Sequence, residues 1–354
     1  MARQRIAACL VLAMSALPAL AAITGSVMTP EGSPVAGARV SIYAPETREA
    51  RNARLLSDQP EEVALATTQT SAKGTFSLES PKSPVVHLQV ELKGHRPVRR
   101  TIESNEDSLT LLLSKGTART GRVTDGGKGV GGAVVALSYG DAEVLVRTDD
   151  EGRYDVPDAK GLQRITIVTR DFAIDEEYFL GSSGTVPANE LTRTLKKSTP
   201  VQGRVVGADG KTPVAGAAIL AAGWPLATSG EDGSFTIANP PAEWDALTAR
   251  KDALLGVRQA AKEPSYTVKL EKPATLSGRV LDAKTKLPIA GVSVSLGTRR
   301  FGMFSASTQQ SGVDAKGAWS FFAPAGTYNV TASHPAYQSE TAEISAMAGQ
   351  AASR

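Results

Sequence analysis

Short runs of alternating apolar and polar residues recur along the whole chain, separated by turn-forming residues. A period of two is typical of a β-strand that buries one face. It is seen in Val40/Ile42, Val135/Leu137, Ile219/Ala221 and Val294/Leu296. The 33 glycines and 20 prolines supply frequent turns between these runs. The pattern predicts an all-β protein built from many short strands.

The alternating runs belong to a motif that occurs four times. Each copy opens with a Gly followed two residues later by a Val, at Gly25/Val27, Gly121/Val123, Gly203/Val205 and Gly278/Val280. A turn of the form Pro-x-x-Gly follows at residues 34–38, 213–217 and 288–292, with a degenerate version at 129–133. Pro presets φ and Gly accepts positive φ, so we expect the chain to reverse at each of these sites.

A third element of the repeat is a Gly-x-aromatic sequence that follows an acidic or polar turn. Its copies are Gly74/Phe76, Gly152/Tyr154, Gly233/Phe235 and Gly317/Trp319. An apolar residue stands two positions after each aromatic one, so we predict that all four rings lie in hydrophobic cores.

The order of these elements resembles the carboxypeptidase regulatory-like domain family of the transthyretin-like class. Repeat four is the fullest match, because it continues with Pro-Ala-Gly-Thr-Tyr at residues 324–328 and His-Pro-Ala-Tyr at 334–337. The resemblance implies a Greek-key β-sandwich of about seven strands and brings no catalytic residues with it.

The repeats predict four tandem sandwich domains after a leader. Their predicted bounds are 1–21 for a signal peptide, then domains at 22–116, 117–198, 199–273 and 274–354. The first three repeats end at Leu113, Leu195 and Leu270, and the next opening Gly comes eight residues later each time. Because a flexible linker would tolerate any length, we expect a semi-rigid rod of phased domains.

The fourth repeat departs from this rule, since residues 345–354 are mostly small and polar and read as a loop. We therefore expect domain 4 to lack its last strand. That would leave a sheet edge able to accept a strand from a partner. The alternative is a chain cut from a longer array.

The first 21 residues have the form of a secretory signal peptide. A basic start through Arg5 precedes an apolar run from Ile6 to Leu17 and a small-residue site at residues 19–21. The run is too short to span a bilayer, so we expect export without a membrane span, to the periplasm, the cell surface or the medium. Lipidation of Cys9, the one cysteine, is the weaker alternative because only five residues precede its cleavage box.

Composition and residue spacing argue against several classes of function. The formal net charge of +3 is spread among interspersed acids and bases, unlike a nucleic-acid-binding face. His87, His95 and His334 are scattered, and no Gly-x-Ser-x-Gly motif has an obvious His and acid after it. We expect neither enzyme activity nor a cofactor; calcium at residues 149–151 is a minor alternative.

The candidate ligand contacts are aromatic and basic residues outside the core pattern. They are Trp224, Trp244, Arg299, Arg300 and Phe301. Exposed rings with polar neighbours could stack on sugars, but for Trp224 and Trp244 the favoured interpretation is that they plug interdomain joints. The charged insertion at residues 45–64 reads as a helix with arginines at three-residue spacing, expected to present a solvated face rather than to dock.

These features favour a non-catalytic exported protein that binds a partner or acts as a spacer. Its candidate partners are carbohydrate or an envelope protein, and fold-level analogy alone supports the carbohydrate. The alternatives are an accessory subunit of a larger secretion, peptidase or outer-membrane receptor assembly, and a hydrolase without a recognisable motif.

Overall fold

The computed structural model describes residues 22–353 except 80, 82, 84, 104–107, 180–184, 262–264, 290–291, 301–302, 315 and 335. This part of the chain is nearly all β, as predicted, and its one α-helix is α1 (Arg48–Leu55). The strands form eight sheets, which fall into four pairs that we call units 1 to 4.

Units 1 and 2 share one topology. In unit 1 the sheets run β4-β1-β7 and β3-β2-β5-β6, and in unit 2 they run β12-β8-β15 and β11-β10-β13-β14. The strands of unit 1 are β1 (Ala22–Met28), β2 (Arg39–Tyr43), β3 (Ala66–Gln69), β4 (Thr75–Glu79), β5 (Val85–Glu91), β6 (Val98–Glu103) and β7 (Leu109–Leu112). Those of unit 2 are β8 (Arg119–Asp125), β9 (Lys128–Gly129), β10 (Val134–Tyr139), β11 (Ala142–Arg147), β12 (Arg153–Val156), β13 (Arg164–Val168), β14 (Asp175–Tyr178) and β15 (Thr192–Thr194).

Units 3 and 4 repeat that topology strand for strand, with sheets β19-β16-β22 and β18-β17-β20-β21, then β26-β23-β29 and β25-β24-β27-β28. The strands of unit 3 are β16 (Val201–Val206), β17 (Ala218–Ala221), β18 (Trp224–Thr228), β19 (Ser234–Ile237), β20 (Ala246–Lys251), β21 (Leu254–Gln259) and β22 (Tyr266–Lys269). Those of unit 4 are β23 (Ala274–Arg279), β24 (Ser293–Arg300), β25 (Met303–Gly312), β26 (Ala318–Ala323), β27 (Gly326–His334), β28 (Tyr337–Ala346) and β29 (Ala351–Ser353).

Each unit has its own hydrophobic core between its two sheets, and the repeated motif builds it. The Gly of Gly-x-Val lies directly across an antiparallel pair from the repeated aromatic residue, as in Gly25 opposite Phe76. A Cβ on Gly25 would meet the Phe76 ring at 2.8 Å, so the glycine makes room for the ring. All four aromatic residues are buried, which confirms their prediction as core.

A buried hydroxyl fastens the Pro-x-x-Gly turn in three of the units. In unit 1, Thr70 Oγ1 donates to the Val35 carbonyl at 2.7 Å and accepts from the Ala38 N–H at 2.9 Å. Thr148 and Ser229 make the equivalent pairs of hydrogen bonds in units 2 and 3. Unit 4 has Val313 at this place, and a valine has no hydroxyl to make these bonds.

The prediction that domain 4 lacks its last strand is wrong. A short strand, β29, pairs in parallel with β23 through Thr275 to Ser277, in the place that β7, β15 and β22 take in the other units. The sequence hid this strand because its residues, Ala351, Ala352 and Ser353, are small and show no strong apolar alternation. Backbone pairing does not require large side chains. The strand-donating partner inferred from a missing strand therefore loses its basis.

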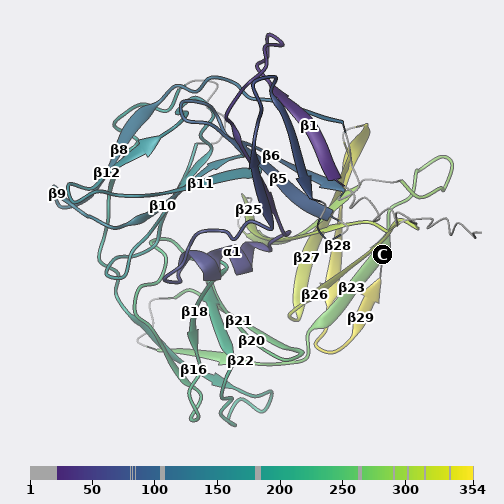
Figure 1. The fold of residues 1–354 in the computed structure, drawn as a ribbon. Coiled ribbons are helices and arrows are strands. Elements are labelled where there is room, and N and C mark those ends of the chain that lie inside the picture. Colours follow the sequence, from purple (N-terminus) through teal and green to yellow (C-terminus); the bar gives the residue numbers. More distant parts are fainter. Residues whose placement is uncertain are drawn as a thin grey trace, which may run out of the picture.

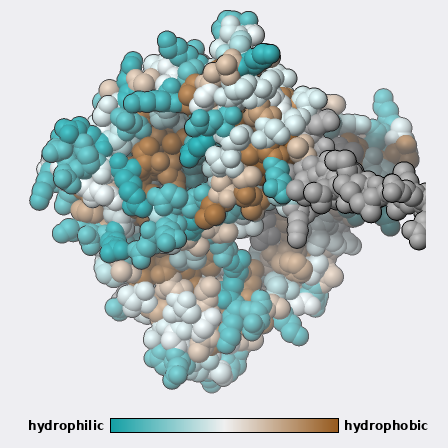
Figure 2. All heavy atoms as spheres, in the orientation of Figure 1, coloured by the Kyte–Doolittle hydropathy of each residue, from teal (hydrophilic) through white to brown (hydrophobic). Residues whose placement is uncertain are grey.

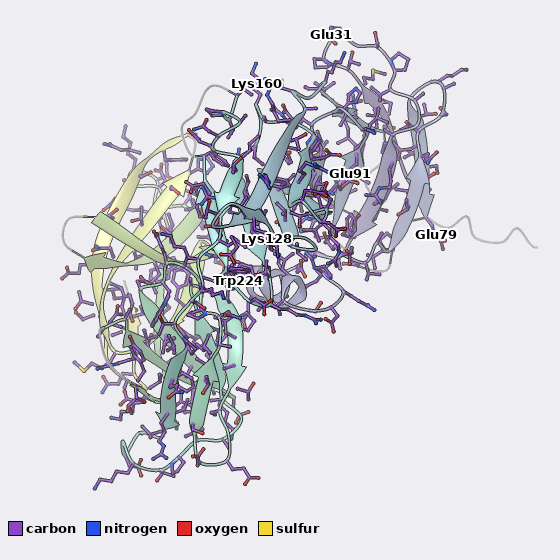
Figure 3. All side chains as sticks on the ribbon, turned by 90° about the vertical axis from the view of Figure 1, so that its left-hand side faces the viewer. Glu31, Glu79, Glu91, Lys128, Lys160 and Trp224 are labelled. Carbon is purple, nitrogen blue, oxygen red and sulfur yellow. The ribbon has the colours of Figure 1, made fainter. Side chains whose placement is uncertain are left out.

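The units curl around α1 rather than forming a straight rod (Figure 1). At right angles to that view, units 1 and 4 lie at opposite sides with units 2 and 3 between them (Figure 3). The rod prediction assumed that each unit contacts only its neighbours in sequence. It is wrong because α1 of unit 1 reaches unit 3, which we describe next.

Candidate functional site

The helix α1 grows from the insertion in unit 1 and is fixed at both ends. Thr47 caps its N-terminus by accepting the Ala50 N–H at 3.1 Å. Arg54 in the last turn pairs with Glu46 and donates to the Pro60 carbonyl, which folds the insertion back on itself. The cap and these bonds hold a helix of only two turns, which would be marginal alone in water.

One face of α1 docks on a hairpin turn of unit 3. Ala222 and Gly223 connect β17 to β18 with φ values of 49° and 80°, so both residues are in the left-handed region. Arg48 donates to the Ala222 carbonyl at 3.3 Å, and Asn52 Nδ2 donates to the Gly223 carbonyl at 3.0 Å. Asn52 is fully buried. The helix of unit 1 thus satisfies two carbonyls of a turn about 170 residues away in sequence.

A second set of contacts joins α1 to unit 2. Arg51 Nε donates to Glu143 Oε2 at 2.8 Å, and both side chains are largely buried. Arg164 lies 3.8 Å from the same carboxylate. From β5 of unit 1, Gln89 Nε2 also donates to the Glu143 carbonyl at 3.0 Å. With Ser138, which donates to Oε2 at 3.3 Å, one glutamate of β11 therefore contacts four side chains, two of them from unit 1.

An apolar cluster fills the centre of this three-unit joint. It brings together side chains from α1, unit 2 and unit 3, namely Leu55, Val134, Ala136, Val168, Ile174 and Trp224. Leu55 is 1% exposed and Trp224 is 0% exposed, so the joint excludes water from both. Figure 3 labels Trp224 beside α1, and Figure 2 shows apolar side chains gathered near α1 and β11 on a mostly polar face.

Two predictions are corrected by this joint. Trp224, one of the candidate ligand contacts, is not exposed, because it is sealed between units, as its favoured interpretation as an interdomain plug predicted. The insertion at 45–64 does not present a solvated face, since its helix docks on units 2 and 3. The sequence concealed the docking because the docked face carries one large apolar residue, Leu55, and otherwise uses polar groups whose partners are distant in sequence.

A buried carboxylate organises the junction between units 1 and 2. Asp158 Oδ1 accepts the Thr117 N–H at 2.9 Å, and Oδ2 accepts Arg96 Nε at 2.5 Å. Burial alone would raise the pKa of the Asp158 carboxyl. The hydrogen bonds from Thr117 and Arg96 outweigh it and hold that pKa below its usual range. The linker after unit 1 is thereby tied to both units at one charged group.

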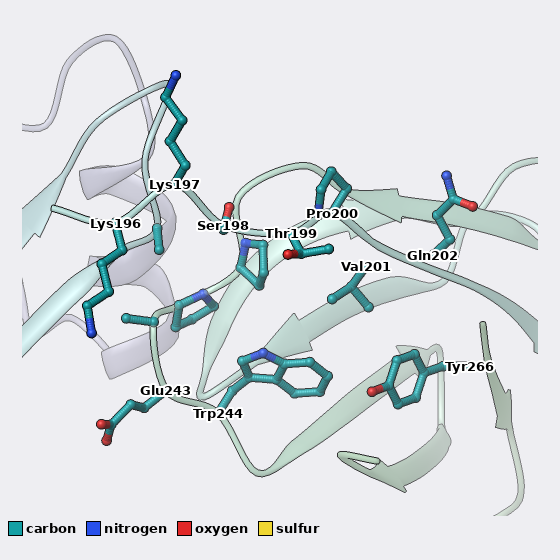
Figure 4. A pocket seen from close by; sticks show the side chains of 14 residues that line it. Lys196, Lys197, Ser198, Thr199, Pro200, Val201, Gln202, Glu243, Trp244 and Tyr266 are labelled. Atoms are coloured by element: carbon teal, nitrogen blue, oxygen red, sulfur yellow. The ribbon is translucent and has the colours of Figure 1, made fainter. Parts of the chain in front are cut away.

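A cleft of about 550 Å³ lies at the junction of units 2 and 3. Its walls are the linker at residues 196–202, the segment 240–244 and Tyr266 of β22 (Figure 4). The predicted ligand contact Trp244 lies in this cleft, partly buried, with its ring 5.7 Å from that of Tyr266 in an edge-on arrangement. The structure thus separates the two tryptophans into a sealed joint and an open cleft.

The other predicted contacts lie far from this cleft in the sequence. Arg299 and Arg300 form the end of β24, where they pair with Phe304 and Met303 of β25. Phe301 lies outside the described residues. Their role in binding stays a prediction.

The described part of the chain holds no group of three or more His, Cys, Asp or Glu side chains placed to bind a metal ion. In the candidate calcium turn at residues 149–151, Asp149 and Glu151 use their carboxylates internally. Asp149 Oδ1 accepts the N–H groups of Glu151 and Arg153, and Oδ2 accepts Arg153 Nε at 2.9 Å. No helix in the described ranges is long and apolar enough to cross a bilayer.

Comparison with known proteins identifies unit 4. Residues 275–354 match the sequence model of the carboxypeptidase regulatory-like domain, the family that the motifs predicted. The chain has no significant match among curated proteins.

Three solved structures illustrate how distant its structural likenesses are. The Bacillus anthracis TIE protein aligns over 94% of this chain and 72% of its own at 11% identity and a TM-score of 0.22. The Bacillus cereus major pilin subunit BcpA aligns over 94% and 97% at 9% identity and a TM-score of 0.19. The T6 backbone pilin of Streptococcus pyogenes aligns over 92% and 80% at 11% identity and a TM-score of 0.20. These scores are too low to support an argument about arrangement or function.

Proposed function

We propose that this chain is an exported, non-catalytic spacer protein that holds its first three β-sandwiches at fixed angles and presents the loops of all four to a surface polymer or a partner protein. The observation that carries the proposal is the joint around α1. A string of independent binding modules would need only flexible linkers. In this chain one helix, α1, fixes the angles among three units.

The chemistry of the joint supports a permanent contact rather than a transient one. Arg51 and Glu143 are paired with little exposure to water, so separating the units would have to rehydrate both charges and expose Leu55 and Trp224 together.

Small-angle scattering of the chain from Ala22 tests the spacer role. We expect one compact, curved particle whose radius of gyration does not change with ionic strength, because the joint is partly apolar and screened from salt. The variant Arg51→Ala/Leu55→Ala should show a larger radius and a broader distribution of distances. An extended profile for the unaltered chain would contradict the proposal.

Export is tested separately through residues 1–21. Fused to a reporter enzyme, this segment should direct the reporter out of the cytoplasm, and Arg3→Glu/Arg5→Glu should reduce that export because the basic start is removed. A reporter that stays in the cytoplasm would contradict the exported location without affecting the joint.

A further inference from the structure

The cleft between units 2 and 3 has the character of a small-molecule site rather than of an imperfect joint. Its volume of about 550 Å³ is within the range of ligand pockets. The joint around Trp224, in contrast, is sealed by apolar side chains. Two junctions of the same chain thus differ, since Trp224 is sealed in one and Trp244 faces open space in the other.

The aromatic part of the cleft wall is the ring of Trp244, which packs against Tyr266. Tyr266 is 5% exposed, and its hydroxyl donates to the Ala261 carbonyl, so it is fixed and not available to a ligand. It meets Trp244 edge-on at an interplanar angle of 63°, which fixes the orientation of the indole. Figure 4 shows the indole nitrogen of Trp244 directed across the cleft toward Ser198 and Thr199. The cleft therefore offers one aromatic surface and one oriented N–H donor.

Polar groups of both kinds surround this ring. Thr199 contributes a hydroxyl from the linker wall, whereas the amide of Gln202, in β16, points away from Trp244 (Figure 4). Lys196 and Glu243 lie together at one end of the cleft, whereas Lys197 points away from Trp244 (Figure 4). One positive and one negative group at the mouth favour a ligand without net charge, and mixed donors and acceptors favour one with many hydroxyls.

We propose that this cleft binds one pyranose unit of a neutral polysaccharide, with the sugar ring stacked on Trp244. The C–H bonds on one face of a pyranose carry partial positive charge and pack against the negative face of an indole. The hydroxyls at the edge of the ring then face Thr199 and the indole N–H, with Lys196 and Glu243 at one end of the cleft. A proline-rich peptide fits less well, because it needs a row of aromatic ridges and the cleft has one available ring. The inference rests on the proposed function, since it names the polymer to which the spacer is presented.

Intrinsic fluorescence offers a site-specific readout of binding. The chain has three tryptophans, and Trp224 and Trp319 are buried at 0% and 6% exposure. Trp244 is the tryptophan that opens on the cleft, so a bound sugar should shift its emission and protect it from a soluble quencher. The probes are cellohexaose, laminarihexaose, maltohexaose and chitohexaose, with hexaproline as a peptide probe.

The expected result is binding of at least one hexasaccharide at a ratio of 1:1 by calorimetry, with a matching change in fluorescence. Trp244→Ala should weaken that binding by about tenfold or more, and Trp244→Phe should weaken it less because a smaller ring remains. Tyr337→Ala is the matched control, since this aromatic side chain is 46% exposed on β28 of unit 4 and should leave binding unchanged.

Several outcomes would overturn the inference. They are the absence of binding by all four sugars at millimolar concentration, equal binding by Trp244→Ala, and binding of hexaproline alone. Scattering of the same samples separates this failure from that of the spacer role, because Trp244 lies outside the three-unit joint. A curved particle that binds no sugar retains the proposed function and loses only the ligand.

Discussion

Two equivalent strands, β10 of unit 2 and β24 of unit 4, have the same place in the same topology but different surroundings. All six residues of β10 are buried, because Val135 and Leu137 face the core of unit 2 while Val134 and Ala136 face α1 and Trp224. In β24, by contrast, Val294 is buried and its neighbours Ser293 and Ser295 are half-buried. The repeated motif builds each sandwich, and the outer face of the four-stranded sheet decides whether that sandwich is locked to others.

This difference is visible in the sequence of the two strands. A strand covered on both faces reads as a continuous apolar run, whereas one covered on a single face alternates. The segment Val134-Val-Ala-Leu137 is continuous and Ser293-Val-Ser-Leu296 alternates. The continuous run was the signal that unit 2 is packed against another part of the chain.

The variant expected to reduce the difference between β10 and β24 most is Glu143→Ala in unit 2. Removing this carboxylate leaves Arg51 and Arg164, both largely buried, without their shared partner. Breaking a buried ion pair from one side costs about 3–5 kcal/mol, and we expect this loss in the free energy of unfolding of unit 2. Urea denaturation followed by hydrogen exchange of β10 amides measures it.

Glu61→Ala is the matched control for Glu143→Ala. Glu61 pairs with Arg147 at 3.4 Å across an exposed surface, with both side chains about half-exposed or more. Exposed ion pairs contribute about 0–1 kcal/mol, so this variant should unfold almost like the unaltered chain. If Glu143→Ala and Glu61→Ala lost equal free energy of unfolding, the burial of Glu143 in the joint would not explain the loss.

The next largest effect is expected for Leu55→Ala, which removes the apolar centre contributed by α1. The side chain is 1% exposed and belongs to no sandwich core, so each unit should stay folded while the joint loses about 2–5 kcal/mol. The backbone amides of β10 should then exchange faster, at rates closer to those of β24. Leu56→Ala, whose side chain is 37% exposed, should change exchange little. Slow exchange at β10 in Leu55→Ala would contradict this account.

Acid should loosen the junction of units 1 and 2 through Asp158. Because its pKa is held below the usual range in the folded chain, the stabilisation is present above the unfolded pKa of about 3.9. It should be lost as the pH falls through the lower folded pKa. We expect urea midpoints between about pH 5 and pH 3 to fall less in Asp158→Asn than in the unaltered chain. Asp155→Asn, an exposed neighbour, should keep the full acid dependence.

Most of the fold of each unit could be predicted from the sequence, because its determinants are local. The glycine opposite each aromatic ring, the Pro-x-x-Gly turn and the period-two strands recur at nearly fixed spacing. The joint could not be predicted in the same way. Asn52 and Arg51 find partners 171 and 92 residues away, and nothing in their local sequence specifies a turn carbonyl or a glutamate of another unit.

The candidate site, like the fold, has a part that could be predicted from the sequence and a part that could not. Trp244 could be singled out as an aromatic residue outside the core pattern, yet so could Trp224, which the structure buries completely. The two differ in how the units meet at each junction, which a single sequence does not encode locally. The short strand β29 was missed for a different reason, since backbone pairing there leaves almost no side-chain pattern.

The smallest expected effect concerns the hydroxyl that units 1 to 3 have and unit 4 lacks. Thr70→Val should leave the Ala38 N–H without an acceptor in a site where both residues are buried, at a cost of about 1–3 kcal/mol in the stability of unit 1. Val313→Thr is the reverse change in unit 4, where Val292 corresponds in the motif to Ala38. The midpoint of thermal unfolding should fall in Thr70→Val and rise in Val313→Thr. If Thr70→Val were as stable as the unaltered chain, the valine of unit 4 would be an equivalent solution, and the fastening would not distinguish that unit from the other three.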